Sequence, residues 1–264
     1  MTARTKTERH RKVDIMNIPM NYVAFDIETT GLSPKYEKII EIGAVRVRDG
    51  QVQDTFSTFV NPGKGLPERI VELTGIHDAD VADAPYMEEV LGTFLAFAGD
   101  DVLLGHNLMF DYSFMKKAAV NQKKTFEKSG IDTLRIARRF LNDVESRSLG
   151  FLCTYYQIYL EAHRALNDAM ATHELYQILA RTFGDKEQDT FQPVPLVYNV
   201  KKENPATPRQ LAYLQGLAGR YHLECDGFVL APVPSVTDEQ IDLETITKNE
   251  ASRLIDRMLA VFGR

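Results

Sequence analysis

The sequence has few of the features that build disulfide frameworks, zinc sites or membrane spans. Only two cysteines occur, Cys153 and Cys225, and neither has a cysteine or histidine partner at zinc-site spacing. No apolar run approaches the roughly 18 residues that a membrane span needs. Residues 2–13 are polar and basic, without the apolar stretch of a signal peptide. We therefore expect buried thiols, no structural zinc, no membrane contact and a cytoplasmic location.

Positive charge is not in excess either. The chain has 31 lysines and arginines against 37 acidic residues, a net charge of −6. A protein that holds nucleic acid by bulk electrostatics is ordinarily basic, so any nucleic-acid contact here must be local. One stretch is rich in basic residues, and it is as consistent with a solvated helix face as with such a contact. It contains Lys116, Lys117, Lys123, Lys124, Lys128, Arg135, Arg138 and Arg139.

The length and composition predict one full-sized domain and a smaller module. With 264 residues, 44% of them hydrophobic, the chain can bury one large core and still have residues left. Residues 1–20 show no apolar periodicity and are expected to form a flexible basic arm. Residues 21–184 form the main domain, and the proline-containing segment 185–204 is typical of a linker. Residues 205–264 then form a small helical module of unknown role.

Two capping boxes predict the starts of the helices of this module. Thr207-Pro-Arg-Gln210 and Thr247-Lys-Asn-Glu250 each place a threonine three residues before a side chain that can bond back to it. An apolar stripe follows each box, so the two helices are expected to pack on each other. The module resembles a small helical domain of unknown function, and that resemblance supplies no activity.

The main domain begins with strand patterns and continues with helices. Residues 22–27, 38–48 and 51–60 are apolar runs, and Asp49-Gly50 between the last two predicts a hairpin. A further short strand is expected at 101–104. Strands that alternate with helices indicate an α/β architecture. The expected helices are 67–73, 85–98, 110–120, 133–141, 149–159 and 165–183.

Two carboxylates, Asp26 and Glu28, follow the first apolar strand pattern. Side chains at i and i+2 of a strand share a face, so these two point the same way. At about 4 Å apart they repel each other by about 4 kcal/mol at an effective dielectric near 20. A half-buried pair therefore requires protonation, a basic partner or a cation, and no lysine or arginine is near in sequence. A solvent-facing edge strand remains an alternative.

Two further acids stand at the starts of expected helices. Asp111 ends the segment Gly105-His-Asn-Leu-Met-Phe-Asp111, between an apolar strand and a helix, where catalytic groups of α/β sheets collect. Asp168 ends His163-Arg-Ala-Leu-Asn-Asp168, at the front of the longest helix. Taken alone, Asp111 is equally consistent with an acid favoured by the helix dipole.

The motifs taken together resemble a known family. Asp26-x-Glu28, His106-Asn107-x-x-Phe-Asp111 and His163-x-Ala-x-x-Asp168, in this order, resemble the three motifs of the DEDDh 3′–5′ exonucleases. This family includes the proofreading epsilon subunit of bacterial DNA polymerase III. The resemblance runs from about residue 21 to 183. It implies a ribonuclease H-like fold, which is a mixed five-stranded sheet flanked by helices.

The chemistry of such a site follows from its side chains. Two divalent cations about 4 Å apart can neutralise a phosphodiester and activate a water. All-oxygen ligation favours Mg²⁺ or Mn²⁺ over zinc. Histidine ordinarily titrates at about 6.5, so His163 suits a general base better than a ligand. The resemblance implies that Asp26 bridges both cations, that Glu28 and Asp168 complete one site, and that Asp111 assists the second.

The resemblance also suggests residues that contact the substrate. Thr29, Thr30 and Leu32 match a segment that in relatives lies along the terminal nucleotide. His106 and Asn107 have two open roles. They either contact the substrate or support the strand end from within the protein.

We therefore expect a metal-dependent 3′–5′ exonuclease that acts on single-stranded or frayed DNA ends in repair or proofreading. An RNA exonuclease of the same fold and a non-catalytic nucleic-acid-binding scaffold are the alternatives. Retention of all five site residues favours catalysis. An acidic chain with one short basic stretch implies brief encounters with nucleic acid, or delivery by a replication or repair protein.

Overall fold

The computed structural model describes residues 18–200, 204–237, 240–243 and 246–263. The chain divides into two compact units, and the main boundary between them falls between Tyr198 and Asn199. No helix within these described ranges is long and apolar enough to cross a membrane.

A mixed sheet forms the centre of the first unit. Among the described residues it has six strands in the order β3-β2-β1-β4-β5-β6. The pairs β1–β2, β2–β3 and β5–β6 are antiparallel, whereas β1–β4 and β4–β5 are parallel. The mixed α/β sheet is as expected, with one strand more than the five expected. The strands are β1 Tyr22–Thr29, β2 Ile39–Arg48, β3 Gln51–Phe59, β4 Leu103–Gly105, β5 Ser129–Asp132 and β6 Val194–Pro195.

The predicted hairpin is present between β2 and β3. Asp49 and Gly50 have φ angles of 49° and 74°, the left-handed values that a two-residue turn of this type requires. The strand β5 was not predicted, because its four residues, Ser-Gly-Ile-Asp, are too few and too polar to show a period.

The segment expected as a linker, 185–204, is partly built into the first unit. It contains the short 3₁₀ helix η1 (Gln188–Phe191) and the edge strand β6. Phe191 is fully buried. The Arg135 side chain also donates hydrogen bonds to carbonyls of this segment. A single buried aromatic anchor in a polar, proline-containing stretch has no periodicity, so the pattern alone resembled a linker.

Ordered structure also begins before the expected start at residue 21. Ile18 is buried in the core of the first unit. The carbonyl of Pro19 accepts a hydrogen bond of 2.9 Å from the hydroxyl of Tyr176. The remainder of the expected basic arm, residues 1–17, lies outside the described residues.

Each expected helix of the first unit is present, with ends that differ by up to three residues. One short helix, α2, was not predicted, because five residues make less than two turns and show no amphipathic period. The helices are α1 Glu68–Thr74, α2 Asp78–Ala82, α3 Met87–Ala98, α4 Met109–Asn121, α5 Thr133–Phe140, α6 Leu149–Tyr156 and α7 Ala165–Phe183.

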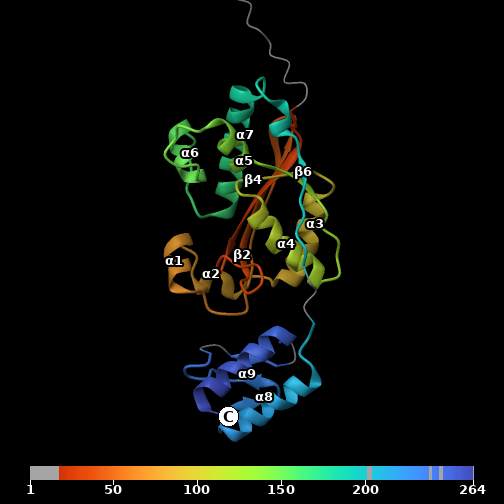
Figure 1. Ribbon diagram of the computed structural model, residues 1–264, viewed down its shortest axis with the longest axis vertical. Helices are drawn as coiled ribbons and strands as arrows, with labels where there is room; N and C mark the ends of the chain where they lie inside the picture. The colour runs from red at the N-terminus through yellow and green to blue at the C-terminus, as the bar shows by residue number, and fades with distance from the viewer. Residues whose placement is uncertain (1–17, 201–203, 238–239, 244–245, 264) are drawn as a thin grey trace, which may run out of the picture. The chain divides into compact units, whose positions relative to one another are not determined.

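The two faces of the sheet carry different helices. Tyr22 and Ala24 of β1 belong to the core shared with α5, α6 and α7. Phe25 faces the other way and packs against Phe94 of α3, with ring centroids 5.6 Å apart. In Figure 1, α6 and α7 lie to the left of the strands and α3 to the right. Because side chains alternate along a strand, Asp26 and Glu28 extend the face that α7 covers.

In its described residues the second unit contains two helices, α8 (Pro208–Arg220) and α9 (Lys248–Phe262). Both predicted capping boxes are formed. The two helices share one apolar core, which includes Leu214 and Leu254, as their stripes predict. The unit is not purely helical, however. Three two-residue strands, too short to show a pattern, form an antiparallel sheet: β7 Cys225–Asp226, β8 Val229–Leu230 and β9 Ile241–Asp242.

Candidate active site

A close approach between β2 and α7 positions the site. Gly43 of β2 lies directly opposite Asp26 of β1 in the antiparallel register. A Cβ atom on Gly43 would lie 2.0 Å from the backbone nitrogen of Leu166 and 2.2 Å from the carbonyl carbon of Ala165. The first turn of α7 therefore rests on the backbone of β2, and only glycine allows this contact. The consequence is that α7 brings Asp168 close to the acids of β1.

The four predicted acids meet in one pocket. Asp26, Glu28 and Asp168 each offer a carboxylate oxygen, and these oxygens lie within 4.8 Å of one another. Asp111 lines the same pocket, which has a volume of about 210 Å³. Its Oδ1 accepts a hydrogen bond of 3.1 Å from the backbone N–H of Ile27. We refer to this as the acidic pocket.

The electrostatics of the acidic pocket favour bound cations. Burial, and then the charges of Asp111, Asp168 and Glu28, raise the pKa of Asp26 well above its usual value. Burial and the neighbouring Asp168 raise the pKa of Glu28 to about 8. Burial also raises the pKa of Asp111 and of Asp168, and backbone N–H donors partly offset this. Clustered carboxylates that repel one another are the all-oxygen donor set that divalent cations such as Mg²⁺ take, so the residues fit such ions.

His163 lies at the entrance to α7 and lines the acidic pocket. Its side chain is exposed and its φ angle is 65°, a left-handed value that is uncommon outside glycine. The next residue, Arg164, donates its backbone N–H to Oδ2 of Asp168 at 3.1 Å. This bond connects the turn to the first turn of α7, so the backbone of the turn has a fixed position relative to Asp168.

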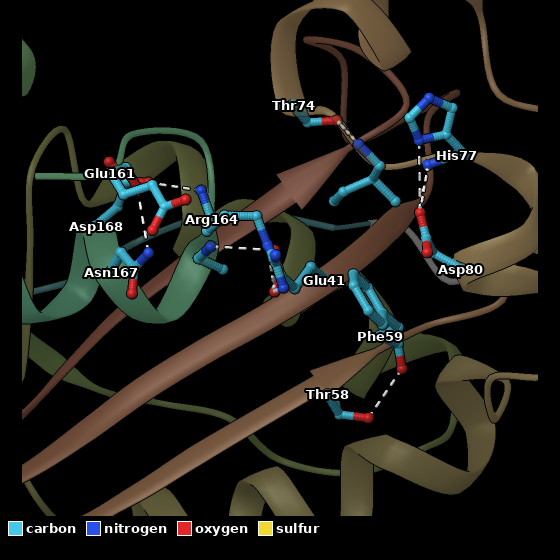
Figure 2. Close-up of polar contacts among 12 residues, drawn as sticks. Glu41, Thr58, Phe59, Thr74, His77, Asp80, Glu161, Arg164, Asn167 and Asp168 are labelled. Atoms are coloured by element: carbon cyan, nitrogen blue, oxygen red, sulfur yellow. Dashed lines mark hydrogen bonds and ion pairs between the residues drawn. The ribbon is translucent and has the colours of Figure 1, made fainter.

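An ion pair that sequence reasoning missed supports this turn. Glu41 of β2 is 2% exposed and lies opposite Glu28 in the register. Figure 2 shows the guanidinium of Arg164 reaching from the start of α7 to this carboxylate, with Nη2 3.1 Å from Oε1. Oε2 of Glu41 also accepts the backbone N–H of Ala165 at 3.1 Å. A charge inside the apolar run Ile40-Glu-Ile-Gly-Ala-Val45 was the available signal.

The end of β1 and the residues after it shape a loop. The Thr29 hydroxyl donates to the carbonyl of Gly31 at 2.7 Å, and the Thr30 hydroxyl donates to Oε2 of Glu37 at 2.6 Å. Both threonines are buried, whereas Leu32 is 77% exposed. The two hydroxyl protons are therefore used within the protein, and Leu32 presents an apolar surface beside them.

His106 and Asn107 line the acidic pocket in different ways. Nε2 of His106 lies 2.9 Å from the carbonyl of Arg147, which can only accept, so Nε2 carries a proton. Nδ1 lies 2.9 Å from the Thr133 hydroxyl, and burial lowers the pKa of the ring. Both ring nitrogens are thus used inside the protein, which favours the supporting role for His106. Asn107 is exposed with a φ of 67°, and its backbone N–H donates to Asp132 at 2.9 Å.

Comparison with known proteins agrees with this geometry. Residues 23–176 match the RNase_T family of exonucleases. A DNA polymerase III of PolC type from Clostridium perfringens is 45% identical over 155 residues, which are 58% of this chain and 11% of that protein. The PolC-type polymerase of Bacillus subtilis is 39% identical over 169 residues, 62% of this chain and 12% of that protein. The chain thus spans only a small part of these relatives.

Solved structures share the fold. Exonuclease X in complex with 5′ overhanging duplex DNA superposes with a TM-score of 0.53 at 25% identity, over 65% of this chain and 99% of that chain. Exonuclease I of E. coli, in complex with a dT13 oligonucleotide, gives a TM-score of 0.57 at 16% identity, over 63% of this chain and 42% of that one. At that identity, the second match shows the fold alone.

The matched region contains all four acids of the acidic pocket and His163. The family resemblance in the three motifs is therefore confirmed by the family match, the relatives and the fold. The chain belongs to the exonuclease family, of the DEDD type within the ribonuclease H-like superfamily.

Proposed function

We propose that this protein is a metal-dependent 3′–5′ exonuclease that hydrolyses single-stranded or frayed DNA ends in the cytoplasm, in DNA repair or proofreading. The observation that carries the proposal is the convergence of Asp26, Glu28 and Asp168 within 4.8 Å, in a chain of the exonuclease family. The PolC-type DNA polymerases among its relatives support DNA as the substrate. The DNA in the exonuclease X complex supports it as well.

The acidic pocket is proposed to hold two Mg²⁺ or Mn²⁺ ions. Asp26 would serve both ions, Glu28 and Asp168 would help to hold one, and Asp111 would assist with the other. Bound there, the ions supply the charge that neutralises the phosphate and activates a water. A structure of E. coli exonuclease I with single-stranded DNA contains zinc, so a related fold admits that ion too. All-oxygen donors nevertheless favour magnesium or manganese for this chain.

The remaining steps belong to protein groups. His163 is proposed as the general base that takes a proton from the attacking water. Its place on an exposed turn next to the acidic pocket gives it access both to that water and to solvent. The bond from the Arg164 backbone N–H to Asp168 holds its turn, so the backbone that carries the imidazole is fixed relative to the acids. A base fixed to its site in this way loses little orientation entropy during the reaction.

The loop after β1 is proposed to hold the terminal nucleotide. The exposed Leu32 offers an apolar surface for its base or sugar. Thr29 and Thr30 use their hydroxyl protons internally, and the backbone N–H of Thr30 donates to the carbonyl of Lys38 at 2.9 Å, so their contribution to substrate binding is through the shape of the loop. Asn107, exposed beside the acidic pocket, is proposed as a further contact, whereas His106 acts from within the protein.

Digestion of matched DNA and RNA strands tests this function. Each oligonucleotide carries a label at its 5′ end and is incubated with the protein and Mg²⁺, with excess chelator as the control. The expected result is a ladder that shortens one nucleotide at a time from the 3′ end, faster for DNA, and absent with chelator. Faster digestion of RNA would reassign the substrate class. No shortening of either strand would overturn the proposed activity and favour a binding scaffold, delivered to nucleic acid by a replication or repair protein.

A further inference from the structure

A second groove adjoins the acidic pocket. It has a volume of about 540 Å³ and shares His106, Asn107 and Leu149 with the acidic pocket. Leu134, Arg138, Arg147 and Ser148 complete its lining. We call it the arginine groove. Because the two cavities share a wall, a polymer whose end lies in the acidic pocket can continue into the arginine groove.

The charge of this groove is opposite to that of its neighbour. Four acids line the acidic pocket, whereas the lining of the arginine groove has two arginines and no acid. The acidic pocket favours cations, whereas the arginine groove favours an anion such as a phosphate group. Arginine is well matched to phosphate, since its planar guanidinium offers several donors in a fixed geometry.

Both arginines retain unused donors. Arg138 is exposed on the last turn of α5 and, among the described residues, its side chain makes neither a hydrogen bond nor an ion pair. Arg147 donates from Nη2 to the carbonyl of Asn142 at 3.0 Å, but its Nε is buried without any acceptor in the described part of the chain. A buried donor without a partner is costly, so a shift of the Arg147 side chain that let Nε reach an anionic oxygen in the groove would recover that hydrogen bond.

Other members of the basic stretch are engaged elsewhere. Lys116 pairs with Glu127, Lys128 donates to the carbonyl of Gly99, and Arg139 pairs with Glu187. Arg138 is therefore distinguished from its neighbour Arg139 by its place in the groove and by its free donors. The sequence left open whether the basic stretch is a solvated helix face or a nucleic-acid contact. Within that stretch, Arg138 is the residue placed for such a contact.

The arginine groove is also tied to the acidic pocket. The ring of His106, at the shared wall, donates from Nε2 to the backbone carbonyl of Arg147 and lies against Thr133 on its other side. This hydrogen bond holds the loop that carries Arg147 close to the end of β4, which His106 follows directly. Ser148, next in the chain, caps α6 and orients its first turn at the groove edge.

We propose that the arginine groove binds the backbone phosphates of the nucleotides that precede the one being removed. This deepens the proposed function, on which it rests, by adding a phosphodiester subsite. Contacts to phosphates do not distinguish one base from another, so binding in this groove should not depend on the nucleotide sequence. It also gives an acidic protein a local contact for a polyanion, because two arginines line a groove beside the proposed cleavage site.

Binding measurements separate this subsite from catalysis. Fluorescence anisotropy of a labelled single-stranded DNA oligonucleotide, in Ca²⁺ and over a range of salt concentrations, compares wild type with Arg138→Gln and Arg147→Gln. Arg139→Gln, one residue away in a surface ion pair, is the matched control, and Arg138→Lys restores the charge. We expect each glutamine variant in the groove to bind roughly tenfold more weakly, with a salt slope lower by about one. The control and the lysine variant keep the wild-type slope.

Hydrolysis of a minimal substrate distinguishes the two proposals. The p-nitrophenyl ester of thymidine 5′-monophosphate has no preceding phosphate, so the groove variants should hydrolyse it at the wild-type rate while their KM for the oligonucleotide rises. If wild type cleaves neither substrate, the exonuclease activity fails, and the groove is judged by anisotropy alone. Unchanged affinity and salt slope in folded Arg138→Gln and Arg147→Gln would overturn the subsite. Equal losses in Arg139→Gln would also overturn it.

Discussion

The guanidinium of Arg164 binds the buried carboxylate of Glu41, with Nη2 3.1 Å from Oε1. This pair joins the central sheet to the turn that carries His163 and to the first turn of α7. Phe59 lies under the guanidinium, with the ring centroid 5.3 Å away. The pair therefore connects the sheet, whose strand β1 carries Asp26 and Glu28, to the helix α7, which carries Asp168.

Replacing Glu41 by glutamine tests this connection. Glutamine can still accept the N–H of Ala165 but has no charge for Arg164, which is about half exposed. We expect a loss of about 1–2 kcal/mol in the free energy of unfolding. A roughly tenfold lower kcat is expected as the turn loosens. Thermal unfolding and oligonucleotide cleavage measure these effects, and Arg139→Gln is the surface control. Wild-type kcat in Glu41→Gln would show that the pair does not position the site.

The contact of α7 with Gly43 predicts a severe effect of one added methyl group. In Gly43→Ala the new Cβ would overlap the backbone of Leu166, so α7 must move away from β2. We expect a loss of about 3 kcal/mol in stability and about a hundredfold in cleavage rate, because Asp168 moves with the helix. Gly216→Ala is the control, since nothing lies within 4 Å of a Cβ there. Full activity in Gly43→Ala would contradict the close approach.

The raised pKa values predict that the stabilisation of the fold by Mg²⁺ increases with pH. The pKa of Glu28 rises from 4.5 to about 8, so the folded protein without metal binds this proton more tightly than the unfolded chain does. Its contribution to stability therefore falls as pH rises through that window. Divalent cations compete with the protons, so the rise in Tm on adding Mg²⁺ should be larger at about pH 8.5 than at about pH 5.5. Thermal unfolding with Mg²⁺ or chelator measures this. An equal rise at both pH values would count against it, and Glu28→Gln should reduce the difference.

Removal of the His163 imidazole should separate catalysis from metal binding. His163→Ala is expected to lower kcat by about a hundredfold or more, since a general base contributes this much. The stabilisation by Mg²⁺ should remain, because the carboxylates are intact. His222→Ala, an exposed histidine of the second unit, serves as the control. A wild-type rate in His163→Ala would exclude the histidine as the base.

Much of the first unit follows from local pattern. The hairpin at Asp49-Gly50, the existence of the strands up to β4 and the long helix α7 all have clear apolar patterns or turn residues. The elements that were missed are β5, β6, α2 and η1, which are too short to show a period. In the expected linker, one buried aromatic side chain, Phe191, outweighs a polar and proline-containing composition.

The site was predictable for a different reason. Asp26 and Glu28 are charges on an apolar strand, a pattern that left protonation, a basic partner or a cation open. The resemblance of the three motifs to an exonuclease family then favoured the cation. The same reasoning applied to Glu41 would have predicted a buried partner for it, although not which residue. The role of Gly43 could not be foreseen, because the approach of a helix 120 residues later in the chain is a tertiary property. The split of the basic stretch into paired residues and the free Arg138 is likewise visible only in the fold.

The most direct measurement is cleavage of 5′-labelled DNA by Asp26→Asn and wild type at equal Mg²⁺, alongside their thermal unfolding. If the acidic pocket holds the ions that drive hydrolysis, Asp26→Asn stays folded and is at least as stable as wild type without metal, because one repelling charge is removed. It then gains little stability from Mg²⁺ and forms no ladder of products. A folded Asp26→Asn protein that shortens the DNA from its 3′ end at the wild-type rate would contradict a catalytic site at these carboxylates.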